Sequence, residues 1–344
     1  MKSNVKIGSI YLGKKGAAES HLLLTQQLIE SGCDLKTLIT KKNEKMSEYL
    51  ELSHKLMLLQ LPTNPMGLFK LLMFPRFSGD VLNFMRDRDI VYFYLPHVLD
   101  NRVAAKLLKN KIYVIRSIHD SKRRSGDYWP TKFSIKRQMK FSSEIILHSQ
   151  YVASQVPRSG NFKILPLPTP KRSTTSNMGP PYILFIGRFR SYKGIRKLIQ
   201  AWKILEPKFP KLRLVLAGSG RLPRINLGMR IEILDRWLSP TEIEHLIDGC
   251  ACVVFPYKEA SQSGPLSLAI SAHKTVVITN VGGLLEQAKE GSYVLVDYSA
   301  ESIAKGIEAA LEVKISAINE TLENRQLANY LLVEPKQQGA IPTS

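Results

Sequence analysis

Two cations follow an apolar run near the middle of the sequence. The stretch "YILFIGRFRSYKG" has the pattern of a buried strand that ends at Gly187-Arg188, and Lys193-Gly194 follow five positions after the arginine. A strand-to-helix turn here would bring both cations to the amino terminus of the next helix, where anions bind. Arginine offers a planar fork for two oxygens and lysine a compact charge, which together could neutralise a departing nucleoside diphosphate. The motif alone leaves open two solvated surface cations.

Small residues end several later apolar runs in the same half of the chain. "LVLAGSG" ends at Gly218-Ser219-Gly220, "FPYKEASQSGPLSLAI" passes through a Gly-Ser-rich turn into a helix, and "TVVITNVGG" ends at Gly282-Gly283. The turn in the second stretch contains Ser263, Gly264, Pro265 and Leu266. Small residues at strand ends let backbone or ligand approach closely, so we expect these turns to form one site.

The first half of the chain offers a histidine in a comparable place. "VIRSIHD" ends an apolar run with His119 and Asp120, which would face the same site from the other side. An imidazole here could position a reacting group or act as a general base, and a structural histidine is the alternative. The first run ends in "LGKKGAAESH", a glycine loop before a helix that contains Gly13, Lys14, Lys15 and Gly16. No third glycine follows at dinucleotide-binding spacing, so a dehydrogenase is disfavoured.

The elements that position these residues alternate between strand-like and helix-like segments along the whole chain. This alternation predicts parallel sheets with crossover helices, and strands rich in Val, Ile and Leu are typical of sheets covered on both faces. Residues 163–177 interrupt the rhythm with prolines and polar residues. We therefore expect two tandem Rossmann-like α/β domains with ligands in the cleft between them. The expected divisions are a first domain at 1–165, a linker at 166–178, a second domain at 179–325 and a tail at 326–344.

Composition limits the partners and the compartment. The 344 residues contain 49 Lys and Arg against 29 Asp and Glu, a formal charge of +20, so anionic partners are favoured. The three cysteines lack the second ligand pair of a zinc site. We identify no signal peptide and no apolar run of about 20 residues that could span a membrane. A cytoplasmic protein is expected, with peripheral attachment to a membrane compatible with its charge.

The order and spacing of the turns in the second half resemble the donor-binding domain of a GT-B-fold glycosyltransferase of family 4 (glycosyl transferases group 1). Enzymes of this family use sugar nucleotides and retain the anomeric configuration. The resemblance implies that Arg188 and Lys193 grip the donor diphosphate and that Gly218 to Gly220 precede the base-binding segment. It places Trp237 and Leu238 beside the nucleobase, although Trp237 could equally pack in the core. It also places His119 at the transferred sugar or its acceptor and the loop from Gly13 to Gly16 across the cleft.

The turn before the third helix of this half departs from the family. Two glutamates eight positions apart usually occur here, and their places fall on Ala260 and Leu268. The sequence instead contains "QSG" at Gln262 to Gly264, similar to a subset of these enzymes, in which Ser263 and the amides of the helix start can donate to phosphate or sugar oxygens. Glu259 lies one position from the expected first carboxylate, and an exposed glutamate is the simpler interpretation.

Basic residues interleave with apolar ones in "TKFSIKRQMKF", which contains Phe133, Met139 and Phe141, and in the apolar segment 64–77. Such segments are typical of helices at an anionic membrane surface, and packed helices with a solvated face are the alternative. The resemblance and these segments predict transfer of a sugar from a nucleoside-diphosphate sugar to a sugar or lipid-linked acceptor, in polysaccharide or glycolipid biosynthesis. No metal or other cofactor and no nucleic acid is expected.

Other function classes stay open at this point. A sugar-nucleotide epimerase or a phosphorylase occurs on the same two-domain architecture, although no lysine has a convincing context for pyridoxal phosphate. A nucleic-acid-binding protein is supported by the net charge alone and lacks recognition motifs. A catalytically inactive homologue that only binds a partner is compatible with the absent glutamates.

Overall fold

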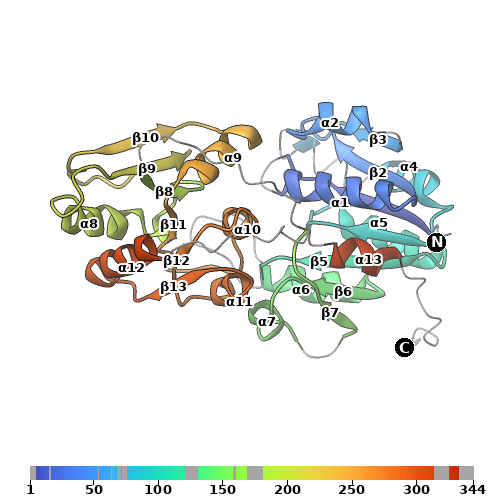
Figure 1. Cartoon of the computed structure of the whole chain (residues 1–344). Helices are drawn as coiled ribbons and strands as arrows, with labels where there is room; N and C mark the ends of the chain where they lie inside the picture. Colours follow the sequence, from blue (N-terminus) through green and yellow to red (C-terminus); the bar gives the residue numbers. More distant parts are fainter. Residues whose placement is uncertain are drawn as a thin grey trace.

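The computed structural model describes residues 5–14, 17–52, 54–62, 64, 66–67, 71, 76–120, 131–157, 160–168, 181–313 and 325–332. Within these residues the chain forms two α/β domains that lie side by side, the first on the right and the second on the left of Figure 1. Each domain has one parallel sheet with helices on both faces. The predicted fold class, two tandem Rossmann-like domains, is confirmed.

The first domain contains a seven-stranded sheet in the order β3-β2-β1-β4-β5-β6-β7. Its strands are β1 (Lys6–Tyr11), β2 (Asp34–Thr40), β3 (Lys55–Leu59), β4 (Ile90–Phe93), β5 (Tyr113–Ile118), β6 (Glu144–Leu147) and β7 (Phe162–Ile164). Its helices are α1 (Ala18–Glu30), α2 (Met46–Glu51), α4 (Arg76–Met85), α5 (Asp100–Lys109), α6 (Thr131–Lys140) and α7 (Gln150–Ala153). All pairings are parallel, so the strands end at one common carboxyl edge.

The second domain repeats this design with a six-stranded sheet in the order β10-β9-β8-β11-β12-β13. Its strands are β8 (Tyr182–Ile186), β9 (Arg213–Gly218), β10 (Ile231–Asp235), β11 (Cys252–Phe255), β12 (Val276–Thr279) and β13 (Tyr293–Val296). Its helices are a 3-10 turn η1 (Ser191–Lys193), α8 (Ile195–Leu205), α9 (Pro240–Gly249), α10 (Gly264–Ser271), α11 (Leu284–Ala288) and α12 (Ala300–Glu312). These helices are the crossovers that the alternation of segments predicts.

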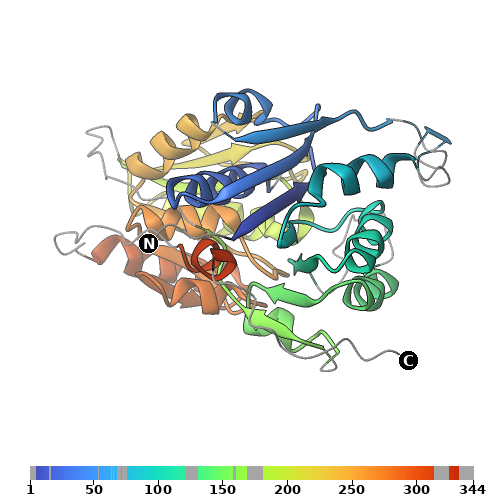
Figure 2. The same cartoon turned by 90° about the vertical axis from the view of Figure 1, so that its right-hand side faces the viewer.

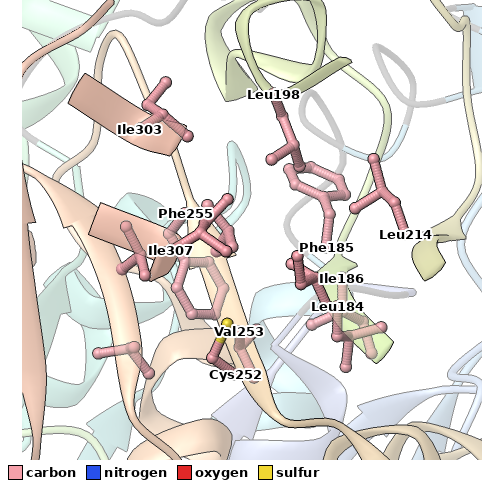
Figure 3. Close-up of a cluster of buried hydrophobic side chains, with 14 of the residues drawn as sticks. Leu184, Phe185, Ile186, Leu198, Leu214, Cys252, Val253, Phe255, Ile303 and Ile307 are labelled. Atoms are coloured by element: carbon pink, nitrogen blue, oxygen red, sulfur yellow. The ribbon is translucent and has the colours of Figure 1, made fainter. Parts of the chain in front are cut away.

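The core of the second domain is a single cluster of apolar side chains. The strands contribute residues that are buried on both faces, as expected for a parallel sheet between two helix layers. Figure 3 shows Phe185 of β8 and Phe255 of β11 among Leu198 of α8 and Ile303 and Ile307 of α12. This packing holds the carboxyl edge of the sheet in place.

The end of the described chain returns to the first domain. Helix α13 (Gln326–Leu332) buries Leu327, Ala328 and Leu331 in the core that contains α1 and β1, and Figure 2 shows it against the first domain. The Tyr330 hydroxyl donates to Glu144 Oε1 at 2.5 Å. Residues 326–332 thus form a packed helix where the sequence analysis expected a tail, because their apolar spacing matches one helix face. Residues 333–344 lie outside the described residues.

The basic helix α6 presents its cations outward and its apolar residues inward. Met139 packs on the cluster that contains β6, and Phe141 contacts the core under α4 and α5. Lys136, Arg137 and Lys140 are exposed. The packed helix with a solvated face is therefore the arrangement observed. The side chain of Phe133 and most of 64–77 lie outside the described residues.

No helix among the described residues is both long and apolar enough to cross a membrane.

Candidate active site

The turn after β8 places one buried cation beside a glycine. Lys193 is only 8% exposed, and its ammonium lies 3.7 Å from the centroid of the Tyr257 ring, within the range of a cation–π interaction. A Cβ added to Gly187 would lie 3.9 Å from Tyr257 Oη and 4.0 Å from both Lys193 Nζ and Pro265 Cγ. Side chains from two turns, those after β8 and β11, thus surround Gly187. Arg188 follows with an exposed side chain at the same turn.

The QSG turn is held by hydrogen bonds to neighbouring segments. Gln287 of α11 accepts from Ser263 N at 2.9 Å and donates to Ser267 Oγ at 3.0 Å. The hydroxyls of Tyr257 and Ser263 lie 3.3 Å apart. The Ser263 amide is therefore already used inside the protein, and the roles of Ser263 and of the amides at the start of α10 toward a ligand stay predictions.

Gly264, the first residue of α10, faces open space. An added Cβ at this residue would meet no atom within 4 Å. Gly264 is also exposed, whereas Leu266 on the same turn is buried in the core. Pro265 is half-buried at the second helical position, where it needs no hydrogen-bond donor. The amino terminus of α10 is thus open on the side of Gly264 and closed on the side of Leu266.

The other predicted glycines pack turn against turn. A Cβ on Gly218 would lie 2.0 Å from Gly187 O, and one on Gly220 would lie 2.5 Å from Phe189 O. The corresponding distances are 1.4 Å from Gly282 to Ala260 O and 2.2 Å from Gly283 to Ser261 O. The structure thus accounts for these glycines by contacts between protein backbones, and any role toward a sugar is additional.

The segment after β10 has one exposed and one buried hydrophobic residue. Trp237 is 48% exposed and Leu238 is 5% exposed. The alternative that Trp237 packs in the core is therefore wrong. Asp235 Oδ1 accepts from Gly220 N at 3.3 Å, which joins this segment to the loop after β9.

The two positions without glutamate are apolar and packed. Ala260 is 7% exposed, and Leu268 packs against the core of the second domain. Glu259 is exposed, as the simpler interpretation expected. Neither position can therefore supply a carboxylate to a ligand.

His119 lies in a row of rings at the carboxyl edge of the first sheet. Its Nε2 donates to Tyr94 O at 2.8 Å, and its ring centroid lies 4.5 Å from that of His148. His148 Nδ1 donates to Leu165 O at 2.8 Å, and its Nε2 accepts from the Ser117 hydroxyl. Burial lowers the pKa of His148 well below its ordinary value, so this ring is neutral. The half-buried Asp120 follows His119 at the strand end.

The glycine loop after β1 is only partly described. A Cβ on Gly13 would lie 2.4 Å from the Tyr11 hydroxyl, so the glycine is required by packing. Lys14 is exposed, and its carbonyl accepts from Glu44 N at 3.0 Å. Lys15 and Gly16 lie outside the described residues.

A hollow of about 360 Å³ lies beside this loop at the ends of β2 and β3. It is lined by Lys42, Gln60, Leu61, Pro62, Asn64 and Gly67.

Sequence reasoning missed four residues that shape the site. Tyr257 ends the run "CVVFPY", so its place at a strand end was a usable signal. Tyr94, His148 and Gln287 carry no local signal, because each acts through a partner at least 17 positions away.

No group of three or more His, Cys, Asp or Glu side chains that could hold a metal ion occurs among the described residues.

Comparisons with known proteins identify similar sequences and similar folds. Residues 168–326 match the family model for "Glycosyl transferases group 1". An uncharacterized glycosyltransferase YqgM of Bacillus subtilis (strain 168) is 26% identical over 162 residues, which cover 42% of this chain and 44% of YqgM. A GDP-mannose:glycolipid 4-beta-D-mannosyltransferase of Xanthomonas campestris pv. campestris is 28% identical over 117 residues, 32% of each chain. The matches thus span less than half the length of these curated relatives.

The fold extends the likeness to nearly the whole chain. The structure of Anabaena Alr3699/HepE in complex with UDP and glucose has a TM-score of 0.67 at 15% identity and covers 90% of both chains. At this identity the likeness shows the fold alone. Residues 168–326 are therefore similar in sequence to glycosyl transferases group 1, and the chain as a whole has the two-domain GT-B fold.

Proposed function

We propose that the protein is a glycosyltransferase that moves a hexose from a nucleoside-diphosphate sugar to a sugar or lipid-linked acceptor. The observation that carries the proposal is the buried ammonium of Lys193 beside the uncovered face of Gly187 and the open end of α10. These groups lie in the segment that matches the family model. The names of the relatives support a nucleotide-sugar donor, since one uses GDP-mannose and the fold neighbour is solved with UDP and glucose.

The donor side of the proposed site neutralises charge. Arg188 and Lys193 hold the diphosphate, and Gly264 lets a phosphate oxygen approach the amino terminus of α10. Both cations stabilise the negative charge that grows on the diphosphate as its bond to the anomeric carbon breaks. Trp237 lies beside the nucleobase, where its exposed ring can stack. The site requires no metal in this proposal.

The acceptor side positions the second substrate. The bond from the anomeric carbon to the diphosphate oxygen breaks, a bond to the acceptor oxygen forms, and the acceptor proton passes to the departing diphosphate, with retention of configuration. The bond from His119 Nε2 to Tyr94 O fixes the orientation of this ring at the acceptor side. A hydroxyl of the sugar or of the acceptor would contact the ring. Asp120, the loop from Gly13 to Gly16 and the hollow beyond it would bind the acceptor.

We infer that the acceptor belongs to a glycolipid or polysaccharide pathway and that the protein works at the cytoplasmic face of a membrane. The exposed cations of α6 support attraction to an anionic surface. Because Met139 and Phe141 are packed inward, α6 would bind by charge and not by insertion.

The experiment uses the wild type, Arg188→Ala and the control Lys203→Ala. Lys203 is exposed in the last turn of α8, so its loss removes one charge far from Gly187. Binding of UDP, GDP, ADP and dTDP is measured by calorimetry, and turnover of the corresponding sugar nucleotide is then followed. Arg188→Ala should lower kcat by a factor of about 10² to 10³, as for loss of one stabilising donor. Lys203→Ala should leave it unchanged.

Three results would contradict the proposal. Unchanged turnover in Arg188→Ala would remove the diphosphate assignment. Conversion of the donor without any acceptor into an epimer would favour an epimerase. Failure of the wild type to bind any of the four nucleotides would favour an inactive homologue.

A further inference from the structure

The two domains touch through the same turns that form the proposed donor site. The side-chain amide of Gln262 donates a hydrogen bond to the carbonyl oxygen of His148 in the first domain. Both carboxylate oxygens of Glu286 accept from Gln150 N at 2.8 Å, and one accepts from Tyr151 N at 3.4 Å. A Cβ on Gly283 would lie 3.2 Å from Ser149 Oγ. Residues 148–151 therefore contact the QSG turn and the start of α11.

His148 connects this contact to His119. Its backbone carbonyl meets the second domain, and its imidazole contacts the His119 ring at a tilt of 53° with 4.5 Å between centroids. Because Ser117 and Leu165 hold both nitrogens of the His148 ring, that ring cannot turn independently of the strand end. A shift of the His148 backbone would therefore move the surface on which His119 rests.

Gln262 has a second constraint on its own side of the contact. The next residue, Ser263, is fixed through its amide by Gln287, and Gly264 after it faces the open end of α10. Gly264 therefore lies on the open side of the turn, whereas Gln262 contacts the first domain. The Gln262 side chain thus connects the proposed diphosphate site with His119.

We propose that Gln262 is a positioning residue for the transfer reaction: its amide sets the distance and angle between the donor turn and His119 through the carbonyl of His148. This inference rests on the proposed function. A donor is required at the Gln262 Nε2 position, because the carbonyl of His148 can only accept. Glutamate at this position would place a carboxylate against that oxygen, and methionine would fill the same volume without donating.

The expected effect is on the rate and not on nucleotide affinity. The diphosphate is held by the second domain alone, so the proposal leaves UDP and GDP binding intact when Gln262 changes. The reacting groups come from both domains, and a displacement of about 1 Å can lower a rate by about 10²-fold. A residue that merely stabilised the fold would lower the melting temperature without separating kcat from affinity.

The test compares Gln262→Met and Gln262→Glu with the wild type and with Gln155→Ala. Gln155 is an exposed glutamine of the first domain, and among the contacts described its side chain bonds only Ser154, so it serves as the control. Calorimetry gives the Kd of UDP and GDP, and steady-state kinetics give kcat and KM for the sugar nucleotide found to be turned over. We expect kcat to fall by about 10- to 100-fold in both Gln262 variants, more in the glutamate variant, with nucleotide Kd within about twofold.

A second measurement needs no catalysis. Hydrogen exchange of the ligand-free protein should be faster over 148–153 and 260–266 in both variants, because the contact between the domains loosens. Unchanged exchange or an unchanged kcat would overturn the proposal, and a parallel loss of UDP and GDP affinity would make Gln262 a donor ligand instead. Failure of the wild type to bind any nucleotide would contradict the proposed function. The exchange measurement would still show whether Gln262 joins the two domains.

Discussion

The two domains share one architecture but differ in the surroundings of their buried charged residues. In the first domain Lys45, Arg88, Asp100, Arg116 and Glu144 are all buried, and each lies within reach of an opposite charge or a hydroxyl. In the second domain Lys193 is the one charged residue that is buried among those described. It lies on the Tyr257 ring beside the uncovered face of Gly187.

This difference teaches that burial of a charge does not by itself identify a functional residue. The ion pairs of the first domain serve packing, since Asp100 at the start of α5 contacts Arg116 of β5 at 3.5 Å inside the sheet layers. A buried pair is costly to break because the remaining charge is left in a medium of low polarity. Lys193 differs because it lies in the turn after β8, where the turn after β11 brings Tyr257 and Pro265 close. The following variants test whether the first group is structural and Lys193 functional.

Asp100→Asn should cause the largest loss of stability. At about pH 8, above the pKa of about 7 that burial gives Asp100, it removes the carboxylate that faces Arg116 and leaves a buried guanidinium without its counter-charge, so we expect a loss of about 3–5 kcal/mol in the free energy of unfolding. Urea titration measures it. The double variant Asp100→Asn/Arg116→Met should recover most of the loss. A loss below about 1 kcal/mol in the single variant would contradict a structural pair.

Lys193→Met should give the opposite result. The methionine keeps an unbranched stem against Tyr257 but removes the charge, so the free energy of unfolding should change by less than about 1 kcal/mol. The rate of sugar transfer should fall by a factor of about 10² to 10³, because one cation that stabilises the departing diphosphate is lost. Retained transfer together with a large loss of stability would place Lys193 with the structural charges of the first domain.

Two glycines allow the same distinction within one turn region. Gly282 has φ +56°, and a Cβ there would lie 1.4 Å from Ala260 O, so Gly282→Ala should cost about 2–3 kcal/mol of stability. Gly264→Ala meets no atom and should change stability by less than about 0.5 kcal/mol. Its methyl group points into the place of the donor, so UDP or GDP affinity should fall by about tenfold. Equal stability losses in the two variants would show that Gly264 is also a packing residue.

The fold could be predicted from the sequence because its signals are local. The buried strands read as runs of Val, Ile and Leu, and the turns after β8, β9, β11 and β12 contain the small residues that their close approach requires. The places of Arg188 and Lys193 follow directly from the first of these turns. A glycine at the end of an apolar run can be recognised in the sequence without knowledge of distant contacts.

The contacts across the molecule could not be predicted in this way. Gln262 meets His148 over 114 positions of sequence, and Glu286 meets Gln150 over 136. Each depends on how two rigid domains dock, which periodicity does not encode. The use of the Ser263 amide by Gln287 was hidden for the same reason, because the pattern "QSG" shows the turn but not the side chain that holds it. The packing of α13 on the first domain likewise depends on the end of the chain returning across both domains.

The smallest effect concerns the pH dependence of stability in the first domain. His21 is fully buried, with Ser9 Oγ at 2.7 Å and the Tyr49 hydroxyl at 2.5 Å from its two nitrogens, and burial lowers its pKa to about 3. Below its ordinary pKa of 6.5 this histidine binds a proton in the unfolded chain but not in the folded chain, so stability falls as pH falls from 6.5 toward 3.

Asp100 acts in the opposite sense, because burial raises its pKa to about 7 and the folded state then holds a proton above pH 3.8. Comparing the slope of unfolding free energy against pH in the wild type and in His21→Phe therefore isolates the histidine. The variant should have a slope that is smaller by about 1.4 kcal/mol per pH unit between pH 4 and 6. Urea unfolding at several pH values measures the slope, which is independent of the stability lost with the two hydrogen bonds. An identical slope in wild type and variant would mean that His21 is protonated inside the fold, and the neutral state assigned to this ring would be wrong.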